Sequence, residues 1–219
     1  MDASHQVRLE NSEGASRLLA GWGLRENLLR DPVRWAYENH VAEVTADEPI
    51  NSRGTTMYLR LTGELRRSLK PLGWTIDRSG NLEMTVHPEG HLAIVVANGD
   101  RDTGQSNRQP CTVSRKGPRT KKALQDQLFD FEEIPRVIRN SRYRAVLVLL
   151  VHVDDIDHEV RCELSRPRTV ADNGYIEEWT VRALLTAIPM TPAPFGGGVS
   201  IVEESDAIDI NISRRSTGA

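Results

Sequence analysis

The sequence predicts an α+β fold in which N-terminal helices pack on a mainly antiparallel β-sheet. Residues 31–45 and 55–72 carry apolar side chains at the three- and four-residue spacing of an amphipathic helix. The apolar runs at 91–97 and 144–153 have the length and the Val, Leu and Ile content of buried strands. Glycine, proline and asparagine turns separate these strands from their neighbours, which is typical of antiparallel hairpins.

Length and composition indicate one larger domain or two small ones. The chain has 219 residues, of which 38% are hydrophobic and 5% aromatic. We expect a helical segment at residues 1–53 and an α+β sheet domain at 54–219, and the two can form one continuous domain. The first ten residues are polar, so we expect them to be frayed.

Helix boundaries follow from capping residues and apolar spacing. Ser12 can cap a short helix through Leu19. Asp31 and Pro32 predict the start of the next helix, because Asp is a favoured N-cap and Pro fits the first turn. The helix at 55–72 has an apolar stripe that predicts its buried face: Tyr58, Leu61, Leu65, Leu69 and Leu72.

The expected strands alternate with short turns along the rest of the chain. The segments with strand character are residues 74–77, 82–87, 91–97, 144–153, 159–164, 179–188 and 208–212. The length of the segment 179–188 also allows a helix. A further helix is expected at 119–131, between the third and fourth of these strands.

Charge and cysteine content restrict the class of protein. The net charge is −3 and the pI about 6.1, so any nucleic-acid surface must come from local segregation of charge. Cys111 and Cys162 lie far apart without a CxxC motif, which argues against a disulfide scaffold or structural zinc and for a reducing compartment. No apolar run approaches the ~18 residues of a membrane span. We therefore expect a cytoplasmic protein that does not associate with membranes.

The most informative stretch is the basic segment, residues 98–122. It contains three glycines and two prolines, and its first part, 98–118, reads as one long loop that we expect to be weakly packed. From Arg108 onward it has six basic residues and no acid: Arg108, Arg115, Lys116, Arg119, Lys121 and Lys122. These six are the predicted binding residues for nucleic acid or another phosphate-bearing partner. Residues 99–104 and 115–119 could wrap a phosphate with backbone N–H groups and guanidinium groups.

An alternative function is metal-dependent nuclease activity. The order helix, three antiparallel strands, helix, strand resembles the core of the PD-(D/E)XK nuclease superfamily. That resemblance implies an acid and an acid-x-Lys pair that hold a divalent metal. The third strand, residues 91–97, has neither an acid nor a lysine. The acids that could substitute are Glu64, Asp77, Glu83, Asp100 and Asp102.

Two polar clusters in expected turns are further candidates for metal ligands. They are His87, Glu89 and His91, and a second group of His152, Asp154, Asp155, Asp157 and His158. Neither has a known metal-binding spacing, and turn residues are usually solvated, so we predict no metal and no cofactor. No motif marks a catalytic nucleophile, which favours a binding protein over an enzyme. The remaining alternative is a protein-interaction module that binds a protein partner or a second copy of the chain.

Overall fold

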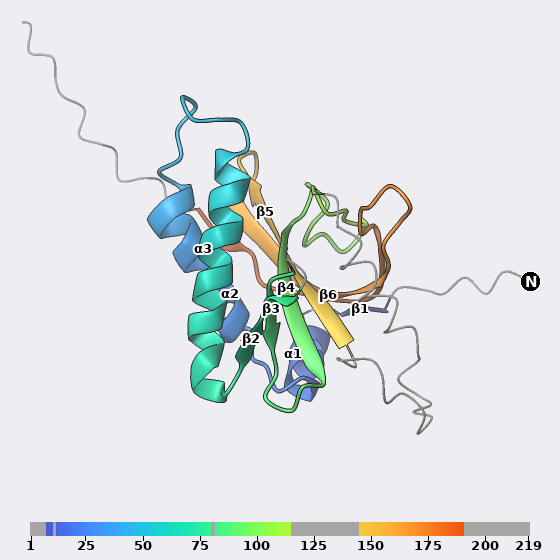
Figure 1. The fold of residues 1–219 in the computed structure, drawn as a ribbon. Coiled ribbons are helices and arrows are strands. Elements are labelled where there is room, and N and C mark those ends of the chain that lie inside the picture. Colours follow the sequence, from blue (N-terminus) through green and yellow to red (C-terminus); the bar gives the residue numbers. More distant parts are fainter. Residues whose placement is uncertain (1–7, 11, 80–81, 115–144, 191–219) are drawn as a thin grey trace, which may run out of the picture.

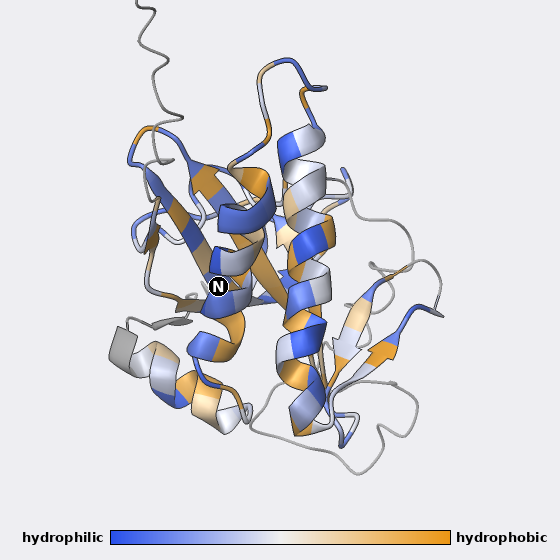
Figure 2. Ribbon diagram, turned by 90° about the vertical axis from the view of Figure 1, so that its left-hand side faces the viewer, coloured by the Kyte–Doolittle hydropathy of each residue, from blue (hydrophilic) through white to orange (hydrophobic). Residues whose placement is uncertain are grey.

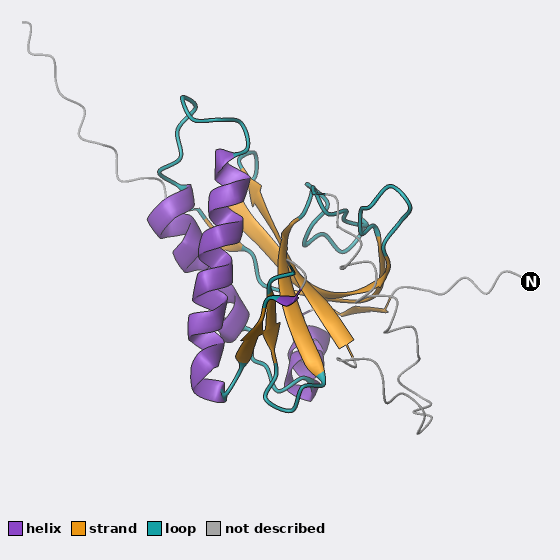
Figure 3. Cartoon of the chain, viewed as in Figure 1, coloured by secondary structure: helices purple, strands orange, loops and turns teal. Residues whose placement is uncertain are grey.

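The computed structural model describes residues 8–10, 12–79, 82–114 and 145–190 (Figure 1). It has an α+β fold with a mainly antiparallel sheet, as the sequence predicts. The strands of the sheet follow the order β1-β7-β6-β5-β4-β3-β2. The short strand β8 lies outside this order and pairs with β6. Two neighbouring pairs are parallel, β4 with β5 and β1 with β7. The helices lie along one face of the sheet, and loops lie over the other (Figure 3).

The strand positions agree with the periodicity of the sequence. The strands are β1 (Arg8–Glu10), β2 (Thr75–Asp77), β3 (Met84–Val86), β4 (Leu92–Asn98), β5 (Ala145–Asp154), β6 (Glu159–Thr169), β7 (Glu178–Leu184) and β8 (Ile188–Pro189). The expectation of a frayed N-terminus is wrong for residues 8–10, because β1 pairs in parallel with β7. Residues 1–7 lie outside the described part of the chain. The segment expected as one strand at 179–188 is divided between β7 and β8.

The central strands are buried on both faces. In β5, Leu147 and Leu149 face the helices, whereas Val148 and Leu150 face the opposite side. The helix-facing core also contains Leu61 of α3. This arrangement explains why β4 and β5 are apolar at nearly every position: the side chains of a strand alternate between faces, and both faces are covered here.

The helices are α1 (Ser12–Gly21), α2 (Asn27–Ala36) with a π-helical extension (Tyr37–Val41), and α3 (Ser52–Leu69) with a 3-10 turn (Lys70–Leu72). Apolar and hydrophilic positions alternate around α3 (Figure 2), and its buried side packs on the sheet and on α2. Among the described residues, no helix combines the length and apolar content needed to cross a bilayer.

The predicted start of α2 at Asp31 is wrong, because the helix begins one turn earlier and Pro32 lies inside it. Proline has no N–H, so the carbonyl of Leu28, four residues earlier, receives no helical hydrogen bond from it. The Ser68 hydroxyl of α3 donates to that carbonyl instead, at 3.2 Å. Contact with a neighbouring helix thus supplies the missing hydrogen bond. The segments predicted as a helix at 119–131 and as a strand at 208–212 lie outside the described residues.

Candidate functional site

A polar cleft lies where the parallel strands β4 and β5 end. The sheet pairs Asn98 with Val151, so the residues that follow both strands meet at one edge. The cleft has a volume of about 480 Å³, within the range of small-molecule sites, but most of the residues that line it are charged. It is lined by Arg101, Asp102, Gln105, Arg108, His152, Val153, Asp154, Asp155, Ile156, Asp157 and Arg161.

One wall of the cleft is the loop that follows β4, which we call the 99–113 loop. A buried ion pair fixes its position. Arg182 of β7 donates to both carboxylate oxygens of Glu163 in β6, at 2.9 and 2.5 Å, and the two side chains are 4% and 0% exposed. The same guanidinium donates to the carbonyls of Gln105 and Arg108, at 3.1 and 2.5 Å. Glu163 also accepts a hydrogen bond from the Gly104 amide, at 2.9 Å.

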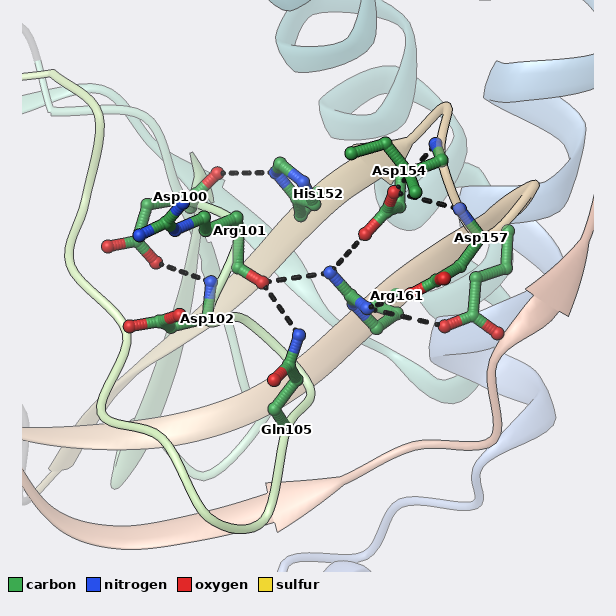
Figure 4. A network of polar contacts seen from close by, with 11 residues as sticks. Asp100, Arg101, Asp102, Gln105, His152, Asp154, Asp157 and Arg161 are labelled. Carbon is green, nitrogen blue, oxygen red and sulfur yellow. Dashed lines mark hydrogen bonds and ion pairs between the residues drawn. The ribbon is translucent and has the colours of Figure 1, made fainter.

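A second buried arginine holds the first turn of the loop against the β5–β6 turn. Arg161 donates to the carboxylate of Asp154 at 2.5 Å and to the carbonyl of Arg101 at 2.8 Å (Figure 4). Its other terminal nitrogen lies 3.3 Å from Asp157. Hydrogen bonds from the Asp157 and Ile156 amides and the nearby Arg161 keep the pKa of Asp154 below its usual value, against the effect of burial. Asp154 therefore stays ionised opposite Arg161.

Two glycines let the 99–113 loop approach the sheet closely. A Cβ at Gly104 would stand 2.9 Å from the Cβ of Arg161, and the φ angle of +75° is one that other residues rarely adopt. A Cβ at Gly99 would collide with the hydroxyl of Thr103, at 2.1 Å. Both glycines are thus explained by packing inside the protein.

The backbone of this loop does not provide the phosphate cradle that residues 99–104 suggested. The amides of Asp102 and Gly104 donate to the carboxylates of Asp100 and Glu163. Those of Gly99, Asp100 and Thr103 donate to the carbonyls of Val151, Cys111 and Asp100. Five of the six N–H groups of residues 99–104 thus have partners within the protein, so we expect side chains to make most of the contacts with a bound anion.

The far half of the loop packs on the same face of the sheet. The Trp179 indole donates to the carbonyl of Pro110 at 2.8 Å, and the Thr112 amide donates to the carbonyl of Ile176 at 3.0 Å. Val113 returns to the end of β4 by donating to the Asn98 carbonyl, at 2.9 Å. The expectation of weak packing is therefore wrong for residues 99–113. Residues 115–118 of the predicted loop lie outside the described part of the chain.

Of the exposed charged side chains of the cleft, the acids have a partner of opposite charge, whereas two arginines have none in the part of the chain that the structure describes. Asp155 forms a two-point ion pair with Arg53 of α3, at 2.5 and 2.8 Å, and this pairing lowers the pKa of Asp155. The side chains of Arg101 and Arg108 are exposed and have no acidic partner among the described residues. His152 donates from Nδ1 to the Gly99 carbonyl at 3.2 Å, since a carbonyl can only accept.

Of the six predicted binding residues, Arg108 lies in the described part and lines the cleft. The other five lie outside the described residues: Arg115, Lys116, Arg119, Lys121 and Lys122. Of the five acids considered for a nuclease site, Asp102 lines the cleft and the other four have local partners. Asp77 accepts a hydrogen bond from the Ser79 amide at 2.8 Å. Glu64 pairs with Arg67, Glu83 pairs with Arg66 and Arg78, and Asp100 caps the turn of its own loop.

Among the described residues, one group of three potential metal ligands lies close together, and it is His87, Glu89 and His91. In the second turn cluster, Asp154 and Asp157 pair instead with Arg161, and Asp155 pairs with Arg53. Comparisons with known proteins gave no matching family model, no similar curated protein and no similar solved structure.

The sequence reasoning missed Arg161, Glu163 and Arg182, although β6 carries a signal for the first two. Between Val160 and Leu164, polar residues alternate with apolar ones in a strand that pairs on both sides. Charged side chains on the inner face of such a strand require buried partners of opposite charge.

Proposed function

We propose that this chain is a non-enzymatic protein that binds nucleic acid, or another phosphate-bearing partner, at the polar cleft and along the basic segment. The observation that carries the proposal is the pair Arg101 and Arg108. Both are exposed, both line the cleft, and neither has an acidic partner among the described residues. Guanidinium groups present planar pairs of donors that match phosphate oxygens.

The rigid backbone beneath these two arginines supports this function. Arg182 and Arg161 donate to the carbonyls of Arg108 and Arg101, so buried groups position the main chain that carries each exposed cation. Binding then orders two side chains and leaves the backbone unchanged. A preorganised site loses less conformational entropy when its ligand binds.

The cleft and the basic segment have separate parts in the proposal. Within the cleft the charges are balanced. The four acids of its lining, Asp102, Asp154, Asp155 and Asp157, are offset by Arg101, Arg108 and Arg161 and by Arg53 of α3, which pairs with Asp155. Long-range attraction of an anionic partner therefore has to come from the sequence after Arg108, where five cations follow without an acid: Arg115, Lys116, Arg119, Lys121 and Lys122. Arg101 and Arg108 would make the direct contacts.

The proposal predicts binding that depends on salt and hardly on sequence. Fluorescence anisotropy with single- and double-stranded DNA and RNA would measure affinity over a series of KCl concentrations. Each phosphate contact contributes ~0.7–0.9 to the slope of log affinity against log salt. We expect the slope to fall by about 1.4–1.8 when Arg101 and Arg108 are both changed to Ala. The triple change of Arg115, Lys116 and Arg119 to Ala should lower it further and reduce affinity equally for all sequences.

A matched control removes two cations elsewhere. Arg17→Ala with Arg60→Ala changes the net charge by the same amount on exposed positions of α1 and α3. This variant should keep the slope of the parent protein. The proposal is wrong if no DNA or RNA binds at low salt, and the basic segment would then be assigned to a protein partner. Cleavage that requires Mg²⁺ or Mn²⁺ and is lost in Asp100→Ala would instead support the nuclease alternative.

A further inference from the structure

The turn between β3 and β4, residues 87–91, brings three potential metal ligands together at some distance in sequence from the cleft residues. One ligand atom from each of His87, Glu89 and His91 lies within 4.8 Å of the other two. The imidazole rings of His87 and His91 have centroids 4.3 Å apart. Nδ1 of His91 lies 3.3 Å from a carboxylate oxygen of Glu89.

The distances between these side-chain atoms are close to those between two ligand atoms of one metal ion. Zinc binds imidazole nitrogen and carboxylate oxygen at about 2.0–2.2 Å, usually with tetrahedral geometry. Two ligands on such an ion are therefore about 3.3–3.5 Å apart. The His91–Glu89 pair already has this spacing, and a side-chain movement of up to about 1.5 Å brings His87 to it.

The backbone of the turn is fixed by hydrogen bonds. The His87 amide donates to the Leu92 carbonyl at 2.8 Å, and the Gly90 amide donates back to the His87 carbonyl at 2.8 Å. The carbonyl of His91 accepts from Ala145 at the start of β5, at 3.0 Å. The three candidate ligands thus project from a short hairpin connection that is tied to the central sheet.

Packing and a hydrogen bond fix the ring of His87. The ring packs edge-on against the buried Trp74, with centroids 5.1 Å apart. Nδ1 of His87 now accepts a hydrogen bond from the Glu89 amide, at 3.2 Å. A metal at Nδ1 would replace this hydrogen bond. A metal at Nε2 would require the ring proton to move to Nδ1, and a protonated Nδ1 can no longer accept the hydrogen bond from the Glu89 amide.

We propose that His87, Glu89 and His91 form a binding site for a divalent transition-metal ion of the zinc type. Two imidazoles and one carboxylate are the ligand set that borderline ions such as Zn²⁺ and Co²⁺ prefer. Ca²⁺ requires six or more oxygen ligands, and Mg²⁺ prefers oxygen ligands as well, so neither matches this turn. With three protein ligands, the ion would keep a further position for water or for another group.

The test uses the full-length chain without a histidine tag, stripped of metal with a chelator that is then removed. Calorimetry with Zn²⁺ and the visible absorption of added Co²⁺ would give stoichiometry, affinity and geometry. We expect one ion per chain, with binding evident at about 100 µM metal, an affinity of roughly −5.5 kcal/mol or better. Ca²⁺ and Mg²⁺ at the same concentration should not compete.

Three variants each remove one ligand: His87→Ala, His91→Ala and Glu89→Gln. Changes outside the ligand shell already reduce metal affinity about 10–100-fold, so each of these should lower it at least tenfold. The control His158→Asn removes an imidazole from the β5–β6 turn and should leave affinity unchanged. Asn suits that position because His158 has a φ of +52°.

The proposal is overturned if no ion binds at this concentration, or if all three variants bind as well as the parent. Glu89 is exposed, so Glu89→Gln tests the site without disturbing the core. Circular dichroism of each histidine variant separates loss of a ligand from loss of the fold. If one of them unfolds, Gln in place of Ala at the same position gives the same test.

Discussion

Replacing Glu163 with Gln should strongly destabilise the protein and release the 99–113 loop. Glu163 is fully buried and neutralises Arg182, which is 4% exposed. Glutamine has nearly the same shape, so the change creates no cavity. It removes the charge that compensates a buried guanidinium, and in either orientation of the new amide its NH2 group faces an N–H group of Arg182. Breaking a buried ion pair in this way costs about 3–5 kcal/mol.

Urea denaturation followed by circular dichroism would measure this loss. A domain of this kind unfolds with a free energy of about 5–15 kcal/mol, so the variant should still fold. With a slope of about 2 kcal/mol per molar urea, the midpoint should fall by about 1.5–2.5 M. Hydrogen exchange would then locate the change, because the amide of Gly104 loses its carboxylate acceptor. We expect faster exchange there than in β5.

An exposed ion pair provides the control. Arg168 and Glu178 join the same two strands as Glu163 and Arg182, but at 4.0 Å and on the surface. Arg168→Ala should change stability by no more than about 0.5 kcal/mol. The double variant Glu163→Leu with Arg182→Leu should recover part of the loss, because no unpaired charge remains. A cost below about 1 kcal/mol for Glu163→Gln, with unchanged exchange in the loop, would refute the assigned role.

Two further predictions concern titratable groups of β5 and β6. Hydrogen bonds from the backbone amide of Asp157, together with Ile156 and Arg161, lower the pKa of Asp154, so the carboxylate stabilises the native state above its ordinary pKa of 3.8. This contribution should disappear as the pH falls below about 4, and acid titrations of Asp154→Asn should lack that part of the transition. Burial raises the pKa of Cys162 to about 12, so Ellman's reagent should label one thiol of the native protein, Cys111, and two after unfolding.

The sequence predicted the regular elements well because their signals are local. The period of 3.6 in α3 and the uninterrupted apolar runs of β4 and β5 depend on residues within one segment, and each was placed correctly to within a few residues. Helix capping was less reliable. Asp31 and Pro32 have the expected chemistry for a helix start, but Ser68 of α3 satisfies the Leu28 carbonyl and lets the helix continue through the proline.

The candidate site was harder to predict because its contacts join distant parts of the chain. Glycine, aspartate and asparagine in the 99–113 loop are typical of weakly packed connections, and nothing near them in sequence indicates otherwise. The order comes from Arg161 and Arg182, which reach loop carbonyls 60 to 77 residues away. In the turn at 87–91, by contrast, the three candidate ligands are close in sequence. Whether their ligand atoms also lie close together in space depends on the conformation of the hairpin.

The Glu163→Gln variant also connects the fold to the proposed function, since two physical effects on anion binding oppose each other. Removing one negative charge changes the net charge from −3 to −2, which by itself favours an anionic partner. Releasing the 99–113 loop has the opposite effect, because Arg101 and Arg108 lose the fixed backbone that positions them. Glu163 is buried and paired, so its field at the surface is largely cancelled by Arg182. If the 99–113 loop forms the phosphate contacts, the variant should therefore bind the anionic partner more weakly than the parent protein. If all the contacts are made by residues that follow this loop, the variant should bind equally well or more tightly.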